Sequence, residues 1–188
     1  MPSKIRVSYE KNILKTRLAI IIFPLFQQYF GIWTSENEQI DKLIQYTQLN
    51  SRYRGELFEW IPYDRLRNIK YLAQGGFGIV HKVICLDGWL SMYNFEEKIW
   101  LRTVYNLDEQ NYKDASNSQI KNPLKNGKEF GMPVVLKSLN NSSNINENFL
   151  NEWKRHLQCH YKAYSHGAPL IPILGMTQVP DTLNYIVV

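Results

Sequence analysis

The chain has 188 residues, of which 44% are hydrophobic and 21% are charged, and its formal net charge is +5. This balance predicts one folded domain with an appendage and excludes both a disordered chain and two full domains. The positive charge is concentrated in residues 1–35, where five basic residues oppose Glu10 alone, namely Lys4, Arg6, Lys11, Lys15 and Arg17. The remainder is nearly neutral and shows no basic patch interleaved with aromatics, so we expect no nucleic-acid partner.

The first apolar stretch follows this basic start. The run from Leu18 to Phe26 has nine residues and contains Pro24, whereas a membrane-spanning helix needs about 20 residues. We therefore expect no membrane span. A basic start followed by a short apolar run is also typical of a signal peptide or mitochondrial presequence, but no small-x-small cleavage site follows, and a packing segment is the favoured interpretation. Two cysteines, Cys85 and Cys159, favour a reducing compartment and a cytoplasmic location.

A short amphipathic helix is predicted next, ending near Asn50. Thr34 or Ser35 can cap it, with Glu38 closing a capping box. Its apolar positions have helical spacing: Ile40, Leu43 and Ile44. The Ile61–Pro62 step then favours an extended chain. We place a boundary there, between an N-terminal extension over residues 1–57 and a main domain over residues 58–188.

A glycine-rich turn between two strands is predicted over residues 68–83. Gly75, Gly76 and Gly78 surround Phe77, and Val80 follows. A tight hairpin needs one or two glycines. A loop whose backbone N–H groups approach phosphate oxygens also uses glycine, because no Cβ is in the way. The stretch alone leaves both interpretations open.

The middle of the chain predicts a hairpin over residues 89–102, followed by a polar insertion over residues 104–131. A polar loop of this length is usually flexible, and docking of a partner is its functional alternative. The segment "MPVVLKSLNN" then predicts a strand carrying Lys137. An amphipathic helix is predicted over residues 145–163, with Asn144 as its cap, Glu147 at the third position and Glu152 able to point toward the sheet. Its apolar stripe consists of Ile145, Phe149, Trp153 and Leu157.

The order of glycine loop, strand lysine and helix glutamate resembles the small lobe of a eukaryotic protein kinase. The loop G-x-G-x-x-G-x-V is matched by the segment 73–80, with Ala73 replacing the first glycine, and V-A-I-K is matched by residues 134–137, with Val135 replacing the alanine. The segment "PLIPILGMTQVPDTLNYIVV" resembles the last two strands of that lobe. The stretches "EWIPYDRLRNIKYLAQGGFGIVHKV" and "VVLKSLNNSSNINENFLNEWKRHLQ" are most similar to the expanded kinase-like family of arbuscular mycorrhizal fungi. Paired cysteines precede these elements in many members of that family but not here.

The resemblance implies an α+β fold, with a five-stranded antiparallel sheet, the αC helix of kinases and a partly helical N-terminal extension. It implies ATP as ligand, with Mg²⁺ in a complete family member, and an ion pair between Lys137 and Glu152. The residues that it implies for ATP binding are Gln74, Gly75, Gly76, Phe77, Gly78, Val80, Val135 and Lys137.

The chain ends at Val188, at or one residue before the position that resembles the kinase gatekeeper. It contains no H-R-D-x-x-x-x-N, D-F-G or A-P-E motif, so we expect the large lobe, the catalytic residues and the metal ligands to be absent. We expect weak ATP binding and no phosphotransfer. The alternative is a noncatalytic interaction module that docks on another kinase through the αC-like helix or the exposed cleft face.

A metal site is the weakest of the interpretations. Glu152, His156 and His160 are spaced by four residues beside Cys159, and such a ladder can bind zinc. No second ligand cluster lies near in sequence, so we expect no metal there. His156 also stands where an apolar spine residue is usual in kinases.

Overall fold

The computed structural model describes residues 27–28, 30–31, 33–51, 56–75, 78–115, 130–138, 142, 145–168 and 170–188. The described chain is α+β, as predicted. It forms two compact units, one made of residues 1–59 and 146–173 and the other of residues 60–145 and 174–188. No helix among the described residues is long and apolar enough to cross a membrane.

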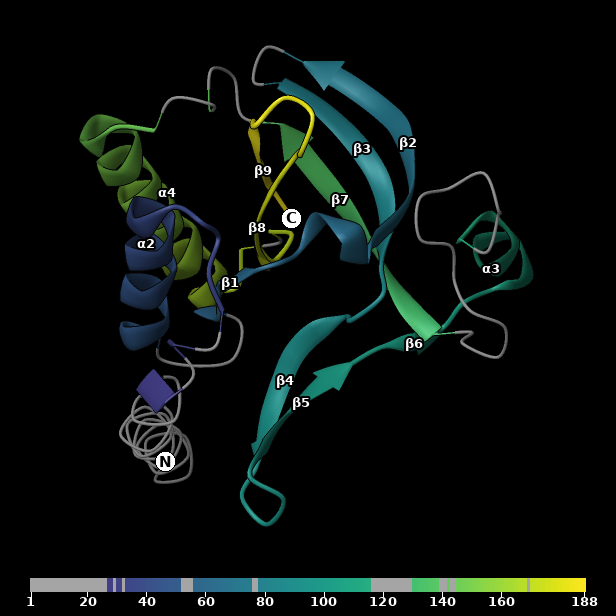
Figure 1. Cartoon of the computed structure of the whole chain (residues 1–188), viewed down its shortest axis with the longest axis horizontal. Helices are drawn as coiled ribbons and strands as arrows, with labels where there is room; N and C mark the ends of the chain where they lie inside the picture. The colour runs from purple at the N-terminus through teal and green to yellow at the C-terminus, as the bar shows by residue number, and fades with distance from the viewer. Residues whose placement is uncertain are drawn as a thin grey trace, which may run out of the picture. The chain divides into compact units, whose positions relative to one another are not determined.

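The second unit is built on a sheet of seven strands (Figure 1). These are β1 (Glu59–Trp60), β2 (Leu66–Gly75), β3 (Gly78–Cys85), β6 (Tyr105–Asn106), β7 (Phe130–Ser138), β8 (Gly175–Gln178) and β9 (Tyr185–Val187). Their order is β1-β8-β9-β7-β3-β2, and β6 pairs with β7. The prediction of five strands, all antiparallel, was wrong, because the sheet is mixed and has seven strands. The two missed strands, β1 and β6, have two residues each, too few to show any periodicity.

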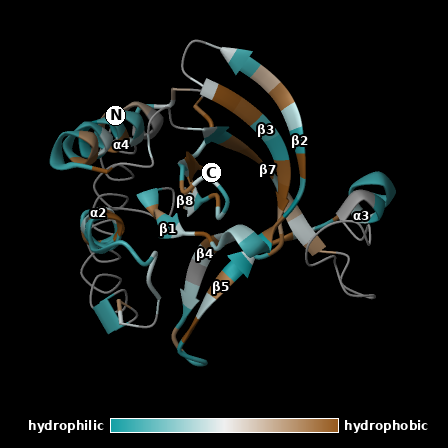
Figure 2. Ribbon diagram, turned by 45° about the horizontal axis from the view of Figure 1, so that its top comes forward, coloured by the Kyte–Doolittle hydropathy of each residue, from teal (hydrophilic) through white to brown (hydrophobic). Residues whose placement is uncertain are grey.

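One face of this sheet carries the main apolar core of the second unit. Strands β3 and β7 both contribute alternate hydrophobic residues (Figure 2), as the two-residue period of a strand requires. The buried members of this core are Ile61, Leu66, Val83, Cys85, Leu136, Leu174, Ile186 and Val188. A smaller cluster around Ile84, formed by Leu86, Leu107 and Tyr112, lies on the other face, because Ile84 alternates with Val83 and Cys85.

The first unit contains helix α2 (Glu38–Leu49), and its cap differs from the prediction. The side chain of Asn37, not that of Thr34 or Ser35, accepts hydrogen bonds from the backbone N–H groups of Gln39 and Ile40, at 3.0 and 3.3 Å. Ser35 instead donates from its backbone N–H to Asp41 at 2.8 Å. The predicted capping box is not formed, because Glu38 is the first helical residue. The carboxylate that accepts from the backbone N–H of Ser35 is that of Asp41 instead.

Helix α4 (Glu147–Ser165), also in the first unit, begins two residues later than predicted. Asn146 caps it, since its side chain accepts from the backbone N–H of Phe149 at 3.0 Å. Asn144, the predicted cap, lies outside the described residues. Asparagines at 144 and 146 satisfy the cap preference equally well, so the sequence could not choose between them.

A separate two-stranded sheet, β4 (Trp89–Asn94) with β5 (Ile99–Thr103), confirms the hairpin predicted over residues 89–102. Tyr93 packs edge-on against Phe95 and Trp100, with ring centroids 5.1 and 5.3 Å apart. A polar network connects the base of the β4–β5 hairpin to the sheet of the second unit. In this network the carboxylate of Asp87 accepts two hydrogen bonds from Arg65, at 2.6 and 2.9 Å. Regular structure continues into the polar insertion with β6 and helix α3 (Glu109–Ala115), where the sequence predicted only a flexible segment; residues 116–129 lie outside the described part.

Candidate functional site

The glycine-rich segment forms the predicted hairpin between β2 and β3. Gly75 and Gly78 are cross-strand partners, so two residues, Gly76 and Phe77, connect the strands and lie outside the described part of the chain. Gly78 has φ of +124°, a conformation that side chains with a Cβ rarely adopt. A Cβ added at Gly75 would meet no atom within 4 Å. The backbone at Gly75 is therefore open to approach by another molecule.

The register of the sheet brings three predicted site residues onto one face. Lys137 on β7 is directly opposite Val80 on β3 and Val187 on β9. Val135, two residues before Lys137, is on the same face and opposite Lys82. Side chains of directly opposite residues share a face, so this face combines an exposed ammonium with half-buried valines at 80 and 135.

Two further lysines belong to the same face and were missed in the sequence. Lys82 is exposed and lies two residues along β3 from Val80, and Lys70 on β2 is its cross-strand partner. The alternation of side chains along a strand could have found Lys82, because Val80 and Lys82 are two residues apart and the core residue Val83 points to the other face. Lys70 could not be found this way, because β2 has register shifts between Arg67 and Lys70 and again after Tyr71.

Arg67 is a fourth cation on this face, opposite Ile84, but its surroundings differ. The residue is only 3% exposed, and one guanidinium nitrogen donates to the carbonyl oxygens of Asp64 and Leu66. Burial and then the nearby charge of Arg65 lower the pKa of Arg67 below its ordinary value. We therefore assign Arg67 to the support of the β2 bulge rather than to the open site.

The other predicted residues are placed differently. Gln74 is opposite Ile79, on the face away from Val80, so its side chain does not join the lysines. Glu152 lies on α4 in the first unit, whereas Lys137 lies in the second. The ion pair between Lys137 and Glu152 therefore stays a prediction.

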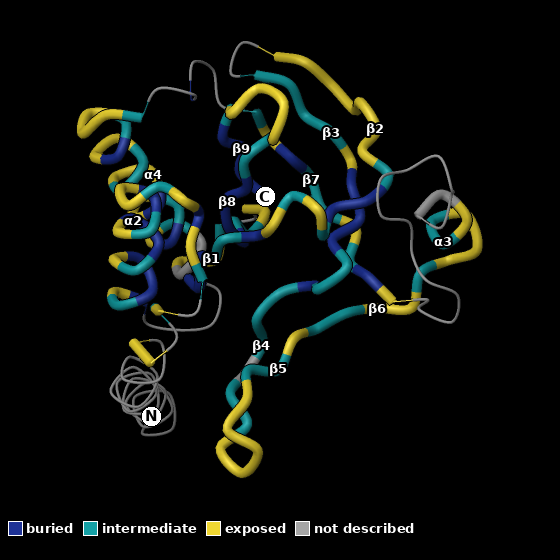
Figure 3. Tube along the Cα trace, viewed as in Figure 1, coloured by how far each residue is buried: buried dark blue, intermediate teal, exposed yellow. Residues whose placement is uncertain are grey.

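The outer strand beside the site is unusually open. All residues from Ile69 to Gly75 on β2 are exposed, so neither face of this part of the strand is covered (Figure 3). Three of them are large and apolar: Ile69, Tyr71 and Leu72, which are 39%, 65% and 56% exposed. Contiguous apolar exposure of this kind is typical of a binding surface.

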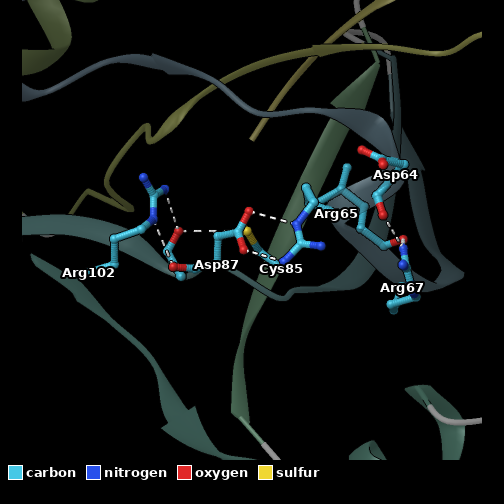
Figure 4. A network of polar contacts seen from close by, with 8 residues as sticks. Asp64, Arg65, Arg67, Cys85, Asp87 and Arg102 are labelled. Carbon is cyan, nitrogen blue, oxygen red and sulfur yellow. Dashed lines mark hydrogen bonds and ion pairs between the residues drawn. The ribbon is translucent and has the colours of Figure 1, made fainter. Parts of the chain in front are cut away.

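The polar network at the base of the β4–β5 hairpin adds charge but little room for chemistry (Figure 4). Arg102 donates to the carbonyl oxygens of Asp87 and Gly88, at 2.9 and 3.2 Å. The hydrogen bonds that Arg65 donates to the carboxylate of Asp87 raise the pKa of Arg65 above its ordinary value. Arg65 is paired with Asp87, and Arg102 is bonded to backbone carbonyl oxygens, so we assign this network to holding the hairpin in place.

Comparison of the sequence with protein-family profiles and with curated proteins finds no match. The arrangement of the site residues themselves therefore has to support any functional conclusion.

Proposed function

We propose that this chain carries the nucleotide-binding small lobe of a protein-kinase-like protein, and that the lysine face beside the β2–β3 hairpin receives ATP. The observation that carries this proposal is the cross-strand row Val80, Lys137 and Val187, next to paired glycines at the end of the hairpin. Val80 and Val135 supply apolar surface for a base, and Lys137 supplies a charge for phosphates. The glycine turn supplies backbone donors.

The chain order of the elements supports the same proposal. The glycine hairpin comes first, then the lysine strand β7, then helix α4 with Glu152, and then β8 and β9. The pairs β2–β3, β3–β7, β7–β9 and β8–β9 are all antiparallel. This is the succession that the kinase resemblance implies.

The charge of the face also favours a polyanion. Lys70, Lys82 and Lys137 are all exposed, and no carboxylate occurs at the positions of β2, β3 and β7 that share this face. Lys70 and Lys82 are directly opposite each other, so their positive charges lie close together on this face.

Phosphotransfer is not part of the proposal for these 188 residues. The catalytic base and Mg²⁺ ligands of kinases belong to the H-R-D and D-F-G motifs, which the sequence does not contain. Without metal, charge compensation for ATP comes from lysines alone. We therefore expect weak binding and no transfer to a protein substrate.

The test is a calorimetric titration of the chain with ATP, with and without Mg²⁺, in Lys137→Met and in a matched control, Lys42→Met. Lys42 is an exposed helix lysine, 2.6 Å from Glu38, so its loss removes a charge without touching the lysine face. We expect Lys137→Met to lower ATP affinity about tenfold, since a charge-assisted hydrogen bond contributes about 1.5–3 kcal/mol. Equal affinities in the two variants would contradict the proposal.

The same titration tests the predicted ion pair between Lys137 and Glu152. If Glu152 holds Lys137 in position, Glu152→Gln lowers ATP affinity in the same direction as Lys137→Met. If the glutamate has no such role, its variant binds like Lys42→Met, and only the ion pair is refuted.

The exposed apolar residues of β2 favour one alternative, a noncatalytic module that docks on a second kinase domain. Leu72→Ser would then weaken association with a purified kinase domain in analytical ultracentrifugation, while leaving ATP titration unchanged. A Leu72→Ser chain that associates as well as the unaltered chain would exclude this surface.

A further inference from the structure

A cavity lies within the first unit, between α2 and α4. Its volume is about 370 Å³, within the range of small-ligand pockets. Its lining residues are Tyr46, Thr47, Asn50, Ser51, Glu56, Lys154, Leu157, Gln158, Tyr161, Lys162 and His166. The lining from Thr47, Ser51, Glu56, Leu157 and Tyr161 is buried, whereas the exposed lining residues are Tyr46, Asn50, Gln158, Lys162 and His166.

Tyr46 on α2 contacts two side chains of α4 at this rim. Its side chain is 37% exposed, and its hydroxyl oxygen accepts a hydrogen bond from Nε2 of Gln158 at 3.1 Å. The ammonium of Lys154 lies over the tyrosine ring, 5.1 Å from its centroid. Both contacts of this tyrosine are therefore made by donors on α4.

These donors belong to a row with helical spacing. Lys154, Gln158 and Lys162 follow one another every four residues along α4, and all three line the same cavity as Tyr46. Side chains four residues apart are neighbours on a helix surface. The amide that touches the tyrosine hydroxyl thus has a lysine one turn to either side.

The negative charge near this row is limited. Among the described residues that line the cavity, Glu56 is the one carboxylate, and it is 2% exposed, in the interior rather than at the rim. His166 lines the cavity one turn beyond Lys162, and its ring is hydrogen-bonded to the carbonyl oxygen of Lys162 at 2.7 Å. The rim beside the tyrosine hydroxyl is therefore cationic.

We propose that Tyr46 is a phosphorylation site whose phosphate is received by the row Lys154, Gln158 and Lys162. A separate tyrosine kinase supplies the reaction: the phenolic oxygen of Tyr46 attacks the γ-phosphorus of ATP, the bond from that phosphorus to ADP breaks, and the phenolic proton passes to the base of that kinase. The product carries a charge of about −1.5 to −2 and three strong acceptor oxygens. Each lysine can then form a charge-assisted hydrogen bond that it cannot form with the neutral ring.

The consequence is a stronger link between two helices. In the unmodified chain, Tyr46 contacts this row through the hydrogen bond from Gln158 and the cation–π contact with Lys154. The phosphate adds ionic contacts on the same side of α4, so it fixes α4 against α2. This inference does not depend on nucleotide binding by the lysine face.

The test uses the full chain with phosphotyrosine installed at position 46 during synthesis. The control carries phosphotyrosine at Tyr105, a tyrosine on β6 that is 54% exposed. Titration followed by phosphorus NMR gives the second phosphate pKa, which is about 6 without perturbation. We expect the value at position 46 to lie about half a unit or more below that at position 105, because nearby cations favour the dianion.

The double variant Lys154→Ala/Lys162→Ala should abolish this difference. Urea denaturation should also show a higher midpoint for the chain phosphorylated at position 46 than for the unmodified chain. Equal pKa values at the two positions, a difference that survives in the double variant, or a phosphorylated chain that does not fold would each overturn the proposal.

Accessibility is tested separately with a broad-specificity tyrosine kinase and ATP, with sites located by mass spectrometry. Modification at Tyr46, absent in Tyr46→Phe, is expected. Modification of Tyr105 with none at Tyr46 would count against the site.

Discussion

Gly88 joins β3 to the β4–β5 hairpin, and we expect its replacement by alanine to be among the most costly single-methyl additions in the chain. Its φ is +63°, and an added Cβ would overlap the carbonyl oxygen of Thr103 and lie 2.7 Å from Cγ1 of Val104. Thr103 is backbone-paired with Trp89, so this oxygen cannot move without breaking the first pair of the hairpin.

The expected cost has two parts. A left-handed conformation costs a residue with a Cβ about 1–2 kcal/mol. Forcing a methyl group into packed surroundings costs a further 1–3 kcal/mol or so. The free energy of unfolding should therefore fall by about 2–5 kcal/mol in Gly88→Ala, by the sum of these ranges.

Alanine variants at two other glycines measure the conformational cost and the packing cost separately. Gly167 has φ of +83° but no atom within 4 Å of an added Cβ, so Gly167→Ala should lose only the conformational part. Gly75 has open space and a φ outside the left-handed region, so Gly75→Ala should be neutral or gain up to about 1 kcal/mol.

The assay is urea denaturation of the three variants, followed by tryptophan fluorescence. Trp89 and Trp100 lie in the hairpin itself and report on its loss. If Gly88→Ala loses no more stability than Gly167→Ala, the overlap with Thr103 does not exist in solution and the account of this turn is wrong.

Three further expectations concern caps and protons. Asn37→Ala removes the acceptor for two N–H groups of α2 and should lower the free energy of unfolding by about 1 kcal/mol in urea denaturation. The hydrogen bond from Lys42, and then its charge, lower the pKa of Glu38 below 4.5, so the stability that this pair contributes is present above pH 4.5 and is lost as pH falls through the folded pKa. Lys42→Ala should raise the pKa of Glu38 in a carbon-13 NMR titration, and an unchanged pKa would refute the ion pair. Burial, and then the charge of Asp181, raise the pKa of Tyr63 above 10. The contribution of this shift to the free energy of unfolding is therefore complete below pH 10 and is lost as pH rises through the folded pKa. Denaturation midpoints above pH 10 should therefore fall less steeply in Tyr63→Phe, and parallel curves would contradict the assignment.

The sequence predicted those elements that repeat a pattern over many residues. These elements are the two strands that flank the glycine-rich turn, the strand of Lys137 and the two amphipathic helices, and each is present. The predicted helix caps were wrong because several residues with capping side chains are close together in the sequence. The choice among Ser35, Asn37 and Asp41 depends on where the first turn of α2 begins in three dimensions.

The candidate site was predictable only in part, for a related reason. Val80, Val135 and Lys137 have motif positions, but their common face follows from the register of β3 against β7. Lys70 is opposite Lys82 because the register of β2 against β3 shifts between Arg67 and Lys70. Strands as short as β1 and β6 depend on the neighbours that they pair with, and a single sequence contains no local signal for them.

The long excursion between β3 and β7 has a consequence for the order of folding. The chain leaves β3 at Cys85, forms the β4–β5 hairpin, β6 and α3, and then enters β7, where Met132 becomes the cross-strand partner of Cys85. The β2–β3 hairpin needs only a two-residue turn and can form on a microsecond timescale, whereas pairing with β7 first requires closing this whole loop. The glycines and Val80 should thus be in place before Lys137 arrives, so an early folding intermediate would display the apolar half of the lysine face without its central charge.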